Sequence, residues 1–173
     1  VGVDAPFVIG RKRELVREFA DYRIEQIKAF PLYEGSARFE SPTLLRVSDV
    51  LLEARHFILA TGSRIAAPPI LGLDEAGYLD SDSVLELETI PKSVIVLGGG
   101  YVACELGQYL ARMGAKTTIV IRGRHLLTSE DEDLGGALMR YFREEGIAVV
   151  NRATMLRAWK REGKQYVEVL VDG

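Results

Sequence analysis

A chain of 173 residues can form one domain, or one domain and part of another, and it can bury a good core. Charged residues make up 27% and hydrophobic residues 47%, as in ordinary globular proteins, and the net charge of −3 gives no electrostatic footprint for nucleic acid. No apolar run approaches the length of a membrane span, and the single cysteine, Cys104, excludes an internal disulfide and a cysteine-based zinc site.

Both ends of the sequence lead us to expect a piece of a longer protein. The first residue is Val1 rather than methionine, and an alternating run over 167–171 leads into Asp172-Gly173, a hairpin signal without its returning strand. No charged and apolar leader opens the sequence, and the single cysteine is consistent with a reducing setting. We therefore expect a cytoplasmic protein.

The amino-terminal third is expected to hold one helix and three short strands. Apolar residues keep a nearly helical spacing over residues 10–29, and Pro31 ends the pattern. Strands are predicted over 36–39, 44–47 and 57–60.

The next segment, residues 67–91, is rich in proline and glycine and is predicted to link two lobes. A brief helix is expected near residues 83–87, where Ser83 and Glu86 have the spacing of a capping box.

Residues 93–122 predict the β-α-β unit around which the sequence is organised. The short apolar run 94–97 is typical of a buried parallel strand. Apolar residues then recur at helical spacing over 106–113, Gly114 stands where the helix should stop, and a second apolar strand follows.

A glycine motif, Gly98-x-Gly100-x-x-Ala103, stands between the first strand and the helix. Gly98 allows a sharp turn, Gly100 lets the backbone approach a pyrophosphate, and Ala103 is small enough for close helix–strand packing. The free N–H groups and the dipole of the helix face that negative charge. Because the strand and helix context is correct, we interpret the motif as dinucleotide-binding rather than as a packing turn.

Residues 129–146 favour a second helix, with a capping box at Ser129 and Glu132 and a stop at Gly146. Its predicted apolar stripe consists of Leu134, Leu138 and Phe142.

The carboxy-terminal residues predict strands. Residues 147–150 form a third strand, which with the first two indicates a parallel sheet. Antiparallel strands are expected over 154–159 and 166–171, joined by a turn at Glu162-Gly163. The expected fold class is α/β: a Rossmann-like β-α-β domain with a parallel sheet and a β-meander.

Three segments occur in an informative order. Residues 56–63 spell HFILATGS, residues 68–72 spell PPILG, and residues 98–105 carry the glycine motif with Tyr101 and Glu105. Together they resemble the pyridine nucleotide–disulfide oxidoreductases, the family of dihydrolipoamide dehydrogenase, glutathione reductase and mercuric reductase. The first segment is similar to the strand and ATG segment beside the flavin in that family, and the second to its interdomain linker.

The resemblance implies two lobes. Residues 1–66 would be the later part of an FAD-binding domain, and residues 92–173 would be most of an NAD(P)-binding domain. The family's amino-terminal FAD motif, its redox-active Cys-x4-Cys pair and its dimerisation domain do not occur in this sequence. We therefore expect FAD and a homodimer in the full-length parent and no catalytic residue in this chain. Cys104 is expected to be a small packing residue.

The resemblance also implies cofactor-binding residues. The backbone around Gly98–Val102 would hold the pyrophosphate, Tyr101 resembles the tyrosine that lies over the flavin, and Glu105 resembles the glutamate near both rings. Without the resemblance, Glu105 would be interpreted as an exposed charge on the helix, and the ATG segment would be interpreted as a simple turn from strand to linker. The implied set is Gly98, Gly99, Gly100, Tyr101, Val102, Glu105, Arg122, Arg124, Ala60, Thr61 and Gly62.

The end of the second strand predicts NADPH rather than NADH. An acid there would hold a free 2′-hydroxyl, but Arg122 follows Ile121 directly and Arg124 lies two residues on. A guanidinium can hold a 2′-phosphate by paired, charge-assisted hydrogen bonds. Arg122 also matches one of two arginines of NADPH-using family members, whereas Thr128 stands where the second is expected and Arg124 would substitute. The alternative is that both arginines are solvated loop charges.

The implied reaction passes hydride from NAD(P)H to FAD and then electrons to a disulfide or mercuric ion, and the cofactors carry the chemistry. The sequence looks most similar to the mercuric reductase and dihydrolipoamide dehydrogenase types, because a helix rich in Arg and Lys is followed by residues 34–39. A stand-alone NAD(P)-sensing module without flavin is the main alternative. A methyltransferase would leave the ATG segment and the linker unexplained. No metal site is expected, because neither His56 nor His125 has a partner at ligand spacing.

Overall fold

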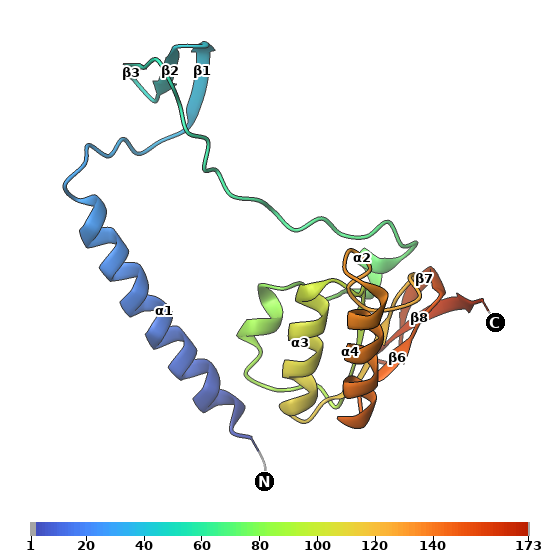
Figure 1. Cartoon of the computed structure of the whole chain (residues 1–173). Helices are drawn as coiled ribbons and strands as arrows, with labels where there is room; N and C mark the ends of the chain where they lie inside the picture. The colour runs from blue at the N-terminus through green and yellow to red at the C-terminus, as the bar shows by residue number, and fades with distance from the viewer. Residues whose placement is uncertain (1–2, 173) are drawn as a thin grey trace. The chain divides into compact units, whose positions relative to one another are not determined.

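The computed structural model describes residues 3–172, and the chain divides into two units (Figure 1). The large unit comprises Val1–Arg11 and Ile65–Gly173, and the small unit comprises Lys12–Arg64. The division falls within the first helix, α1 (Ala5–Ile27).

Helix α1 begins earlier than the apolar spacing predicted, at Ala5 rather than at residue 10. The Asp4 carboxylate accepts a hydrogen bond from the Phe7 N–H at 3.0 Å. This is the bond of a helix N-cap, which satisfies one of the free donors of the first turn. The Asp4 signal was therefore present in the sequence, but periodicity alone did not find it.

The small unit carries an antiparallel sheet in the order β1-β2-β3. Its strands are β1 (Ala37–Ser41), β2 (Leu44–Val47) and β3 (Val50–Glu53). The first two confirm the predicted strands within two residues at each end. Strand β3 was missed, because it follows a two-residue turn at Ser48-Asp49 that contains no glycine.

The strand predicted over 57–60 is wrong. A strand needs a neighbour with which to exchange backbone hydrogen bonds, and within residues 3–172 no strand pairs with this segment. Ile58 and Leu59 are 94% and 72% exposed, whereas the Phe57 ring packs edge-on against Phe39 of β1 with ring centroids 4.9 Å apart. An apolar run alone does not reveal whether a neighbouring strand is present.

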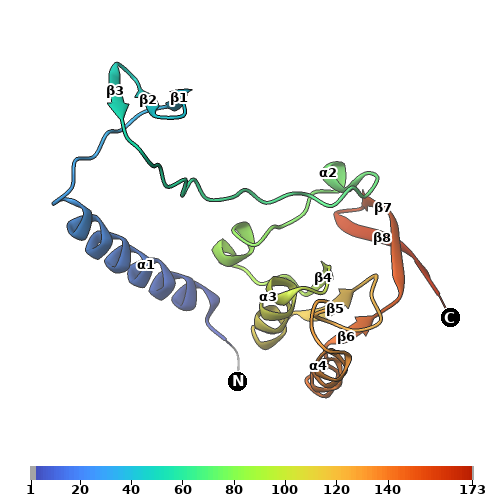
Figure 2. The same cartoon turned by 45° about the horizontal axis from the view of Figure 1, so that its top comes forward.

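The large unit is built on a parallel sheet in the order β4-β5-β6. Its strands are β4 (Ser93–Leu97), β5 (Lys116–Val120) and β6 (Ala148–Val150), and the helices α3 (Tyr101–Arg112) and α4 (Glu132–Glu144) connect them (Figure 2). Leu97 pairs with Val120, and Val120 pairs with Val150, so the three strands end at one edge of the sheet. The predicted β-α-β unit and parallel sheet are confirmed.

The main core lies between the sheet and both helices. Ile119 and Ile121 project from the end of β5 into a buried cluster with Cys104 of α3 and with Phe142 of α4. The buried stripe of α4 differs from the predicted one: Leu134 is exposed, and the stripe consists of Gly135, Met139 and Phe142. Phe142 belongs to both stripes and Leu138 packs partly buried against the same core, so Leu134 is the predicted stripe residue that is wrong.

Both predicted helix stops are confirmed. Gly114 and Gly146 have φ of 104° and 83° and follow the ends of α3 and α4. The next N–H groups bond back into the last turns, Ala115 to Leu110 O at 2.9 Å and Ile147 to Phe142 O at 2.8 Å. These bonds satisfy carbonyls that a helix end leaves free.

The two predicted capping boxes, unlike the helix stops, differ from what the structure shows. Helix α4 starts with Asp131 as N-cap and without a side-chain cap bond, so Ser129 lies outside the helix. The short 3₁₀ helix η1 (Ser83–Glu86) confirms the brief helix; its N-cap is Asp82, which makes no side-chain cap bond, and Ser83 bonds instead to Asp80. The Asp80 carboxylate accepts bonds from the Ser83 N–H at 2.8 Å and the Ser83 hydroxyl at 2.6 Å.

Strands β7 (Ala153–Arg161) and β8 (Lys164–Val171) form the predicted antiparallel hairpin. Glu162 and Gly163 both have positive φ, 52° and 76°, as a two-residue turn of type I′ requires. The predicted hairpin signal at Asp172-Gly173 lies partly outside the described residues.

The segment expected as a linker contributes to the large unit. Helix α2 (Leu73–Ala76) buries Leu73 against Ala158 of β7, and the Ala158 N–H donates to Leu71 O at 2.8 Å. Val84 of η1 is buried against Leu110 of α3. Across residues 3–172, no helix combines the length and the apolar character needed to cross a membrane.

Candidate nucleotide-binding site

The glycine loop, Gly98–Gly100, connects β4 to α3 at the edge where the parallel strands end. The Gly98 N–H donates to Val120 O at 2.9 Å, and the Leu127 N–H donates to Gly99 O at 2.7 Å. The loop is therefore held between the end of β5 and the segment that follows β5. In an open parallel sheet this edge is where ligands bind.

Each glycine of the loop has a different physical requirement. Gly98 has φ of 123°, a conformation that residues with a side chain rarely adopt. A Cβ at Gly99 would lie 2.7 Å from Ile121 Cγ2, so a side chain there would force the buried Ile121 to shift. A Cβ at Gly100 would meet no protein atom within 4 Å. The space beside Gly100 is therefore open to a ligand, which fits the pyrophosphate approach predicted for it.

The start of α3 offers free donors to an anion. Gly100 is the N-cap of this 12-residue helix, and no side chain caps it. The first-turn N–H groups and the positive end of the helix dipole are therefore available beside the open space. Tyr101 is 71% exposed and Val102 is also exposed, so neither side chain covers this helix end. The residues present fit a pyrophosphate.

Glu105 and Cys104 lie next to each other on α3 but face different surroundings. Glu105 is exposed, whereas Cys104 is buried in the main core. Burial raises the pKa of the Cys104 thiol, and the nearby Glu105 carboxylate raises it further. The thiol therefore stays protonated at neutral pH, which agrees with the packing role expected for it.

Gly107 is a glycine that sequence reasoning missed. It lies in the middle of α3, is buried, and faces Ile119 of β5, whose Cδ1 would lie 3.1 Å from an added Cβ. The glycine lets the helix lie close to the sheet, which was the role assigned to Ala103. A glycine inside a helical pattern was the available signal, because its helix propensity is low unless packing requires it.

Arg122 and Arg124 lie in the arginine loop, defined here as Ile121–Leu127, which follows β5. Both residues are exposed. Among the residues that the structure describes, neither guanidinium has a hydrogen bond or an ion pair. Both side chains are thus available to a ligand, as a phosphate-binding role requires, although the same exposure suits a solvated loop charge.

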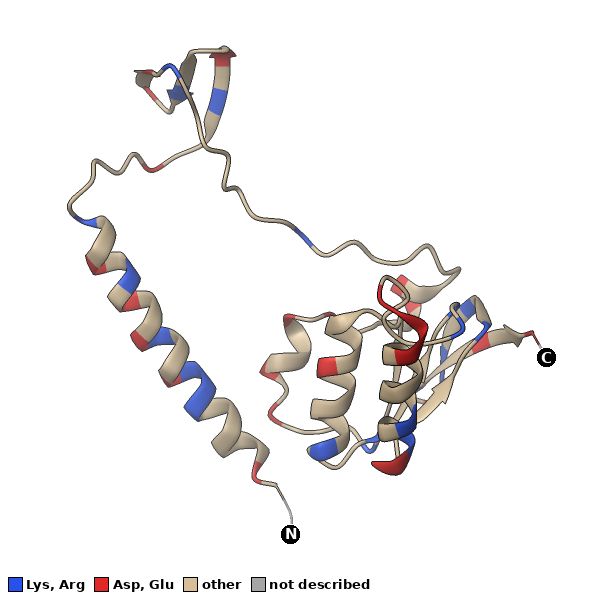
Figure 3. Cartoon of the chain, in the orientation of Figure 1, with Lys and Arg blue, Asp and Glu red and all other residues tan. Residues whose placement is uncertain are grey.

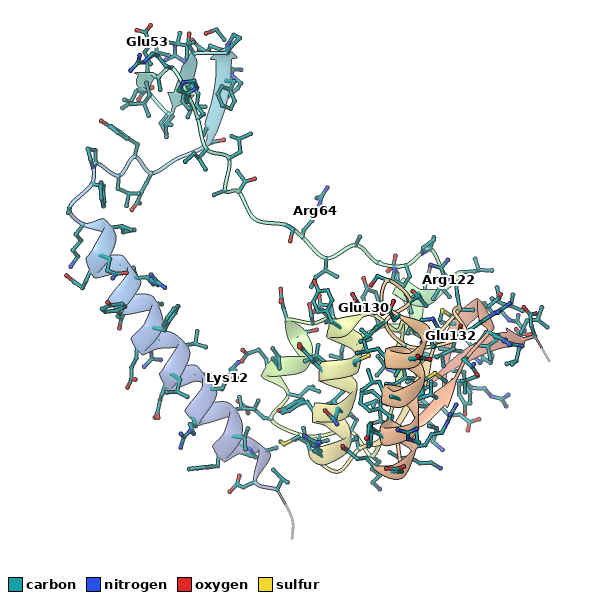
Figure 4. All side chains as sticks on the ribbon, in the orientation of Figure 1. Lys12, Glu53, Arg64, Arg122, Glu130 and Glu132 are labelled. Carbon is teal, nitrogen blue, oxygen red and sulfur yellow. The ribbon has the colours of Figure 1, made fainter. Side chains whose placement is uncertain are left out.

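Acidic residues follow the arginine loop. Glu130, Asp131, Glu132 and Asp133 form a run at the start of α4, drawn in red in Figure 3. Figure 4 labels Arg122, Glu130 and Glu132 at the same end of the large unit. These acids complement the positive end of the α4 dipole. They also lower the electrostatic potential at this end of the unit, which opposes phosphate binding.

Ala60, Thr61 and Gly62 belong to the small unit. Ala60 ends the segment 57–60, Thr61 and Gly62 follow it, all three are exposed, and Gly62 has φ of 70°. Their flavin-lining role remains a prediction.

Metal ligands and redox-active thiols are the remaining groups to consider. Within residues 3–172 no three His, Cys, Asp or Glu side chains gather to hold a metal ion. Cys104 is the only cysteine of the sequence, so the chain has no dithiol. The features that the structure brings together are the open space beside Gly100 and the uncapped start of α3.

Sequence comparisons place these features among known proteins. Residues 11–173 match the family described as Pyridine nucleotide-disulphide oxidoreductase. The chain is 35% identical to mercuric reductase of Streptomyces lividans over 176 residues, covering 97% of this chain and 37% of that protein. It is 36% identical to dihydrolipoyl dehydrogenase of Trypanosoma brucei brucei over 119 residues, covering 66% of this chain and 25% of that protein.

A comparison with solved structures agrees with these sequence comparisons. The HOCl-induced flavoprotein disulfide reductase RclA from Escherichia coli matches with a TM-score of 0.86 and 27% sequence identity, covering 96% of this chain and 39% of that chain. The chain thus spans between a quarter and two fifths of the lengths of these relatives.

Proposed function

Because the chain belongs to the pyridine nucleotide-disulphide oxidoreductase family, we propose that it is the NAD(P)H-binding part of a flavoprotein disulfide reductase. In the whole protein, hydride from NAD(P)H would reduce FAD, and the electrons would pass to a disulfide or to mercuric ion. Residues 1–66 would then contribute to the FAD domain, and residues 92–173 would form most of the nucleotide domain, connected by 67–91.

One observation carries the proposal: open space beside Gly100 coincides with the uncapped start of α3. Backbone N–H groups would bind the pyrophosphate, and the dipole of α3 would stabilise its charge. The nicotinamide supplies the hydride when it is bound. Tyr101 and Glu105, one turn apart on α3, would orient the nicotinamide and shield it from water.

We further propose that the nucleotide is NADPH. Arg122 and Arg124 are exposed and without partners among the described residues, so binding a 2′-phosphate would break no existing ion pair. A guanidinium offers paired donors to such a group. The acidic run Glu130–Asp133 acts in the opposite sense, so the measured preference reports the balance of the two charges.

The parent would be of the mercuric reductase or dihydrolipoamide dehydrogenase type, cytoplasmic and homodimeric. The similarity to mercuric reductase of Streptomyces lividans, at 35% identity, supports the first of these types. The chain alone would be colourless and would not reduce disulfides or mercuric ion with NAD(P)H. A yellow, active preparation would contradict that statement.

The test of nucleotide binding is Gly100→Ala, with Gly136→Ala as the matched control. Neither new methyl group would meet a protein atom within 4 Å, so both variants should fold. Gly100→Ala places the methyl where the pyrophosphate must approach, and NADPH binding should weaken by about tenfold or more, ~1.4 kcal/mol. Gly136→Ala, in the exposed part of α4, should bind normally. Unchanged binding in Gly100→Ala would overturn the site.

A second assay concerns the flavin. The full-length parent should be yellow and should oxidise NADPH with mercuric ion, lipoamide or glutathione as acceptor. A colourless parent that still binds NADPH would instead be the nucleotide-sensing module considered from the sequence.

A further inference from the structure

We propose that Asn151 is a positioning residue that holds the arginine loop in place for the 2′-phosphate of NADPH, an inference that rests on the proposed function. Asn151 follows β6 directly, as Ile121 follows β5 and Gly98 follows β4. The register of the sheet therefore places all three at the same edge.

The arginine loop is bound at several backbone positions. The Ala153 N–H donates to Ile121 O at 2.9 Å, and the Arg152 N–H donates to Gly123 O at 3.0 Å. The Asn151 side-chain amide donates from Nδ2 to Arg124 O at 2.7 Å. Three successive residues after β6 thus hold three carbonyls of the loop.

Asn151 differs from the other two because it acts through its side chain. Substitution cannot remove the backbone donors of Arg152 and Ala153, but it can remove the amide of Asn151. Of the bonds that reach the loop from outside it within residues 3–172, this is the one made by a side chain. The bond also fixes Arg124, whose guanidinium has no partner there.

The far end of the loop is fixed on the glycine loop. Leu127 has φ of 53°, donates its N–H to Gly99 O at 2.7 Å, and follows the fully buried Leu126. Arg122 therefore lies between the bonded carbonyls of Ile121 and Gly123, and Arg124 is held at its own carbonyl by Asn151, three residues before the Leu127 anchor on the glycine loop. Without the Asn151 bond, Arg124 would have to be ordered when the phosphate binds, and that ordering costs affinity.

The consequence is selective. NADH lacks the 2′-phosphate, so the position of Arg124 should matter for NADPH and little for NADH. A merely structural role of Asn151 would weaken both nucleotides together. The ratio of the two dissociation constants therefore separates the two roles.

The experiment measures NADPH and NADH dissociation constants of the 173-residue chain by nucleotide fluorescence. Asn151→Ala should raise the NADPH constant about 3- to 10-fold, the scale of one lost hydrogen bond, and the NADH constant by less than about twofold. Gln165→Ala, which removes an exposed amide from β8, is the matched control and should change neither. Asn151→Ser, which keeps a shorter donor, should fall between Asn151→Ala and the unsubstituted chain.

A double-mutant cycle with Arg124→Ala gives the sharpest outcome. In the Arg124→Ala background, Asn151→Ala should change NADPH affinity by less than about twofold, because the group it positions is gone. Equal losses for the two nucleotides, or additive losses in the cycle, would overturn the Asn151 inference while leaving nucleotide binding intact. Absence of binding by the unsubstituted chain would instead overturn the proposed function together with this inference.

Discussion

The large and small units differ in how completely each buries its apolar residues. The large unit encloses Ile119, Leu126 and Phe142 almost completely between its parallel sheet and two helices. In the small unit, Lys12–Arg64, which the structure describes throughout, Val47 is the only residue classed as buried. The candidate nucleotide site is therefore built on a packed scaffold, whereas the apolar residues of the small unit lie largely in solvent.

The two units differ less in their helices and strands than in whether another element packs against the apolar faces of those helices and strands. Both units contain a helix and strands that their sequence patterns support, but a helix or strand gains stability mainly by burying an apolar face. In the large unit the β-α-β connections bring that face to a neighbour. We expect substitutions to have unequal effects in the two units, and the following predictions start from the largest effect.

The largest effect should come from Phe142→Ala. Phe142 is 2% exposed, so its removal leaves a cavity between α4 and the sheet and should destabilise the large unit by about 3–5 kcal/mol. Phe30→Ala, at a residue 69% exposed in the small unit, should change stability by less than about 0.5 kcal/mol. Denaturant unfolding of the two variants measures the contrast, and similar losses would show that the small unit is packed after all.

A smaller effect should separate two adjacent glycines within the large unit. Gly99→Ala puts a methyl group against Ile121, where the added Cβ would lie 2.7 Å from Cγ2, and should cost about 1–3 kcal/mol of stability. Gly100→Ala should leave stability unchanged and weaken nucleotide binding. If the two variants exchanged these effects, the assignment of packing to Gly99 and ligand approach to Gly100 would be wrong.

The smallest effect concerns an ion pair between the two helices of the large unit. Arg112 of α3 donates to the Glu145 carboxylate from Nε at 3.1 Å and from a terminal nitrogen at 2.8 Å. The hydrogen bond from Arg112 holds the pKa of Glu145 below its ordinary value. A lowered folded-state pKa stabilises the fold above the unfolded pKa, and this contribution is lost as pH falls through the folded pKa.

Glu145→Gln should therefore lower the unfolding midpoint slightly at pH 7, and its difference from the unsubstituted chain should disappear in strong acid. Because the pair is exposed, the loss should be far smaller than that of Phe142→Ala. A difference that grows in acid would contradict the sign of the Glu145 pKa shift.

Sequence patterns predicted those elements whose signals are local. The β-α-β unit, both glycine helix stops and the turn at Glu162-Gly163 followed from residue types with fixed conformational preferences. The segment 57–60 failed because pairing depends on a partner that periodicity does not reveal. In α4, Leu134 was predicted in the stripe and Met139 was not, because both satisfy a helical period with Phe142 and only packing selects between them.

The candidate site shows the same limit. Gly98 and Gly100 could be predicted because a motif assigns their roles. Leu127 and Asn151 could not, because they act through hydrogen bonds that form only when β4, β5 and β6 end side by side. Gly107 has a local signal, because a glycine inside a helical pattern indicates close packing.

The central claim is that this chain holds NADPH through the glycine loop and Arg122, and one titration tests it most directly. The 173-residue chain and its Arg122→Ala variant are titrated with NADPH and with NADH, and Arg161→Ala in the hairpin serves as the charge-matched control. The unsubstituted chain should bind NADPH more tightly than NADH. Arg122→Ala should weaken NADPH by about 1.5–3 kcal/mol, roughly 10- to 150-fold, and leave NADH nearly unchanged. Equal losses for the two nucleotides, or tighter binding of NADH by the unsubstituted chain, would contradict the claim.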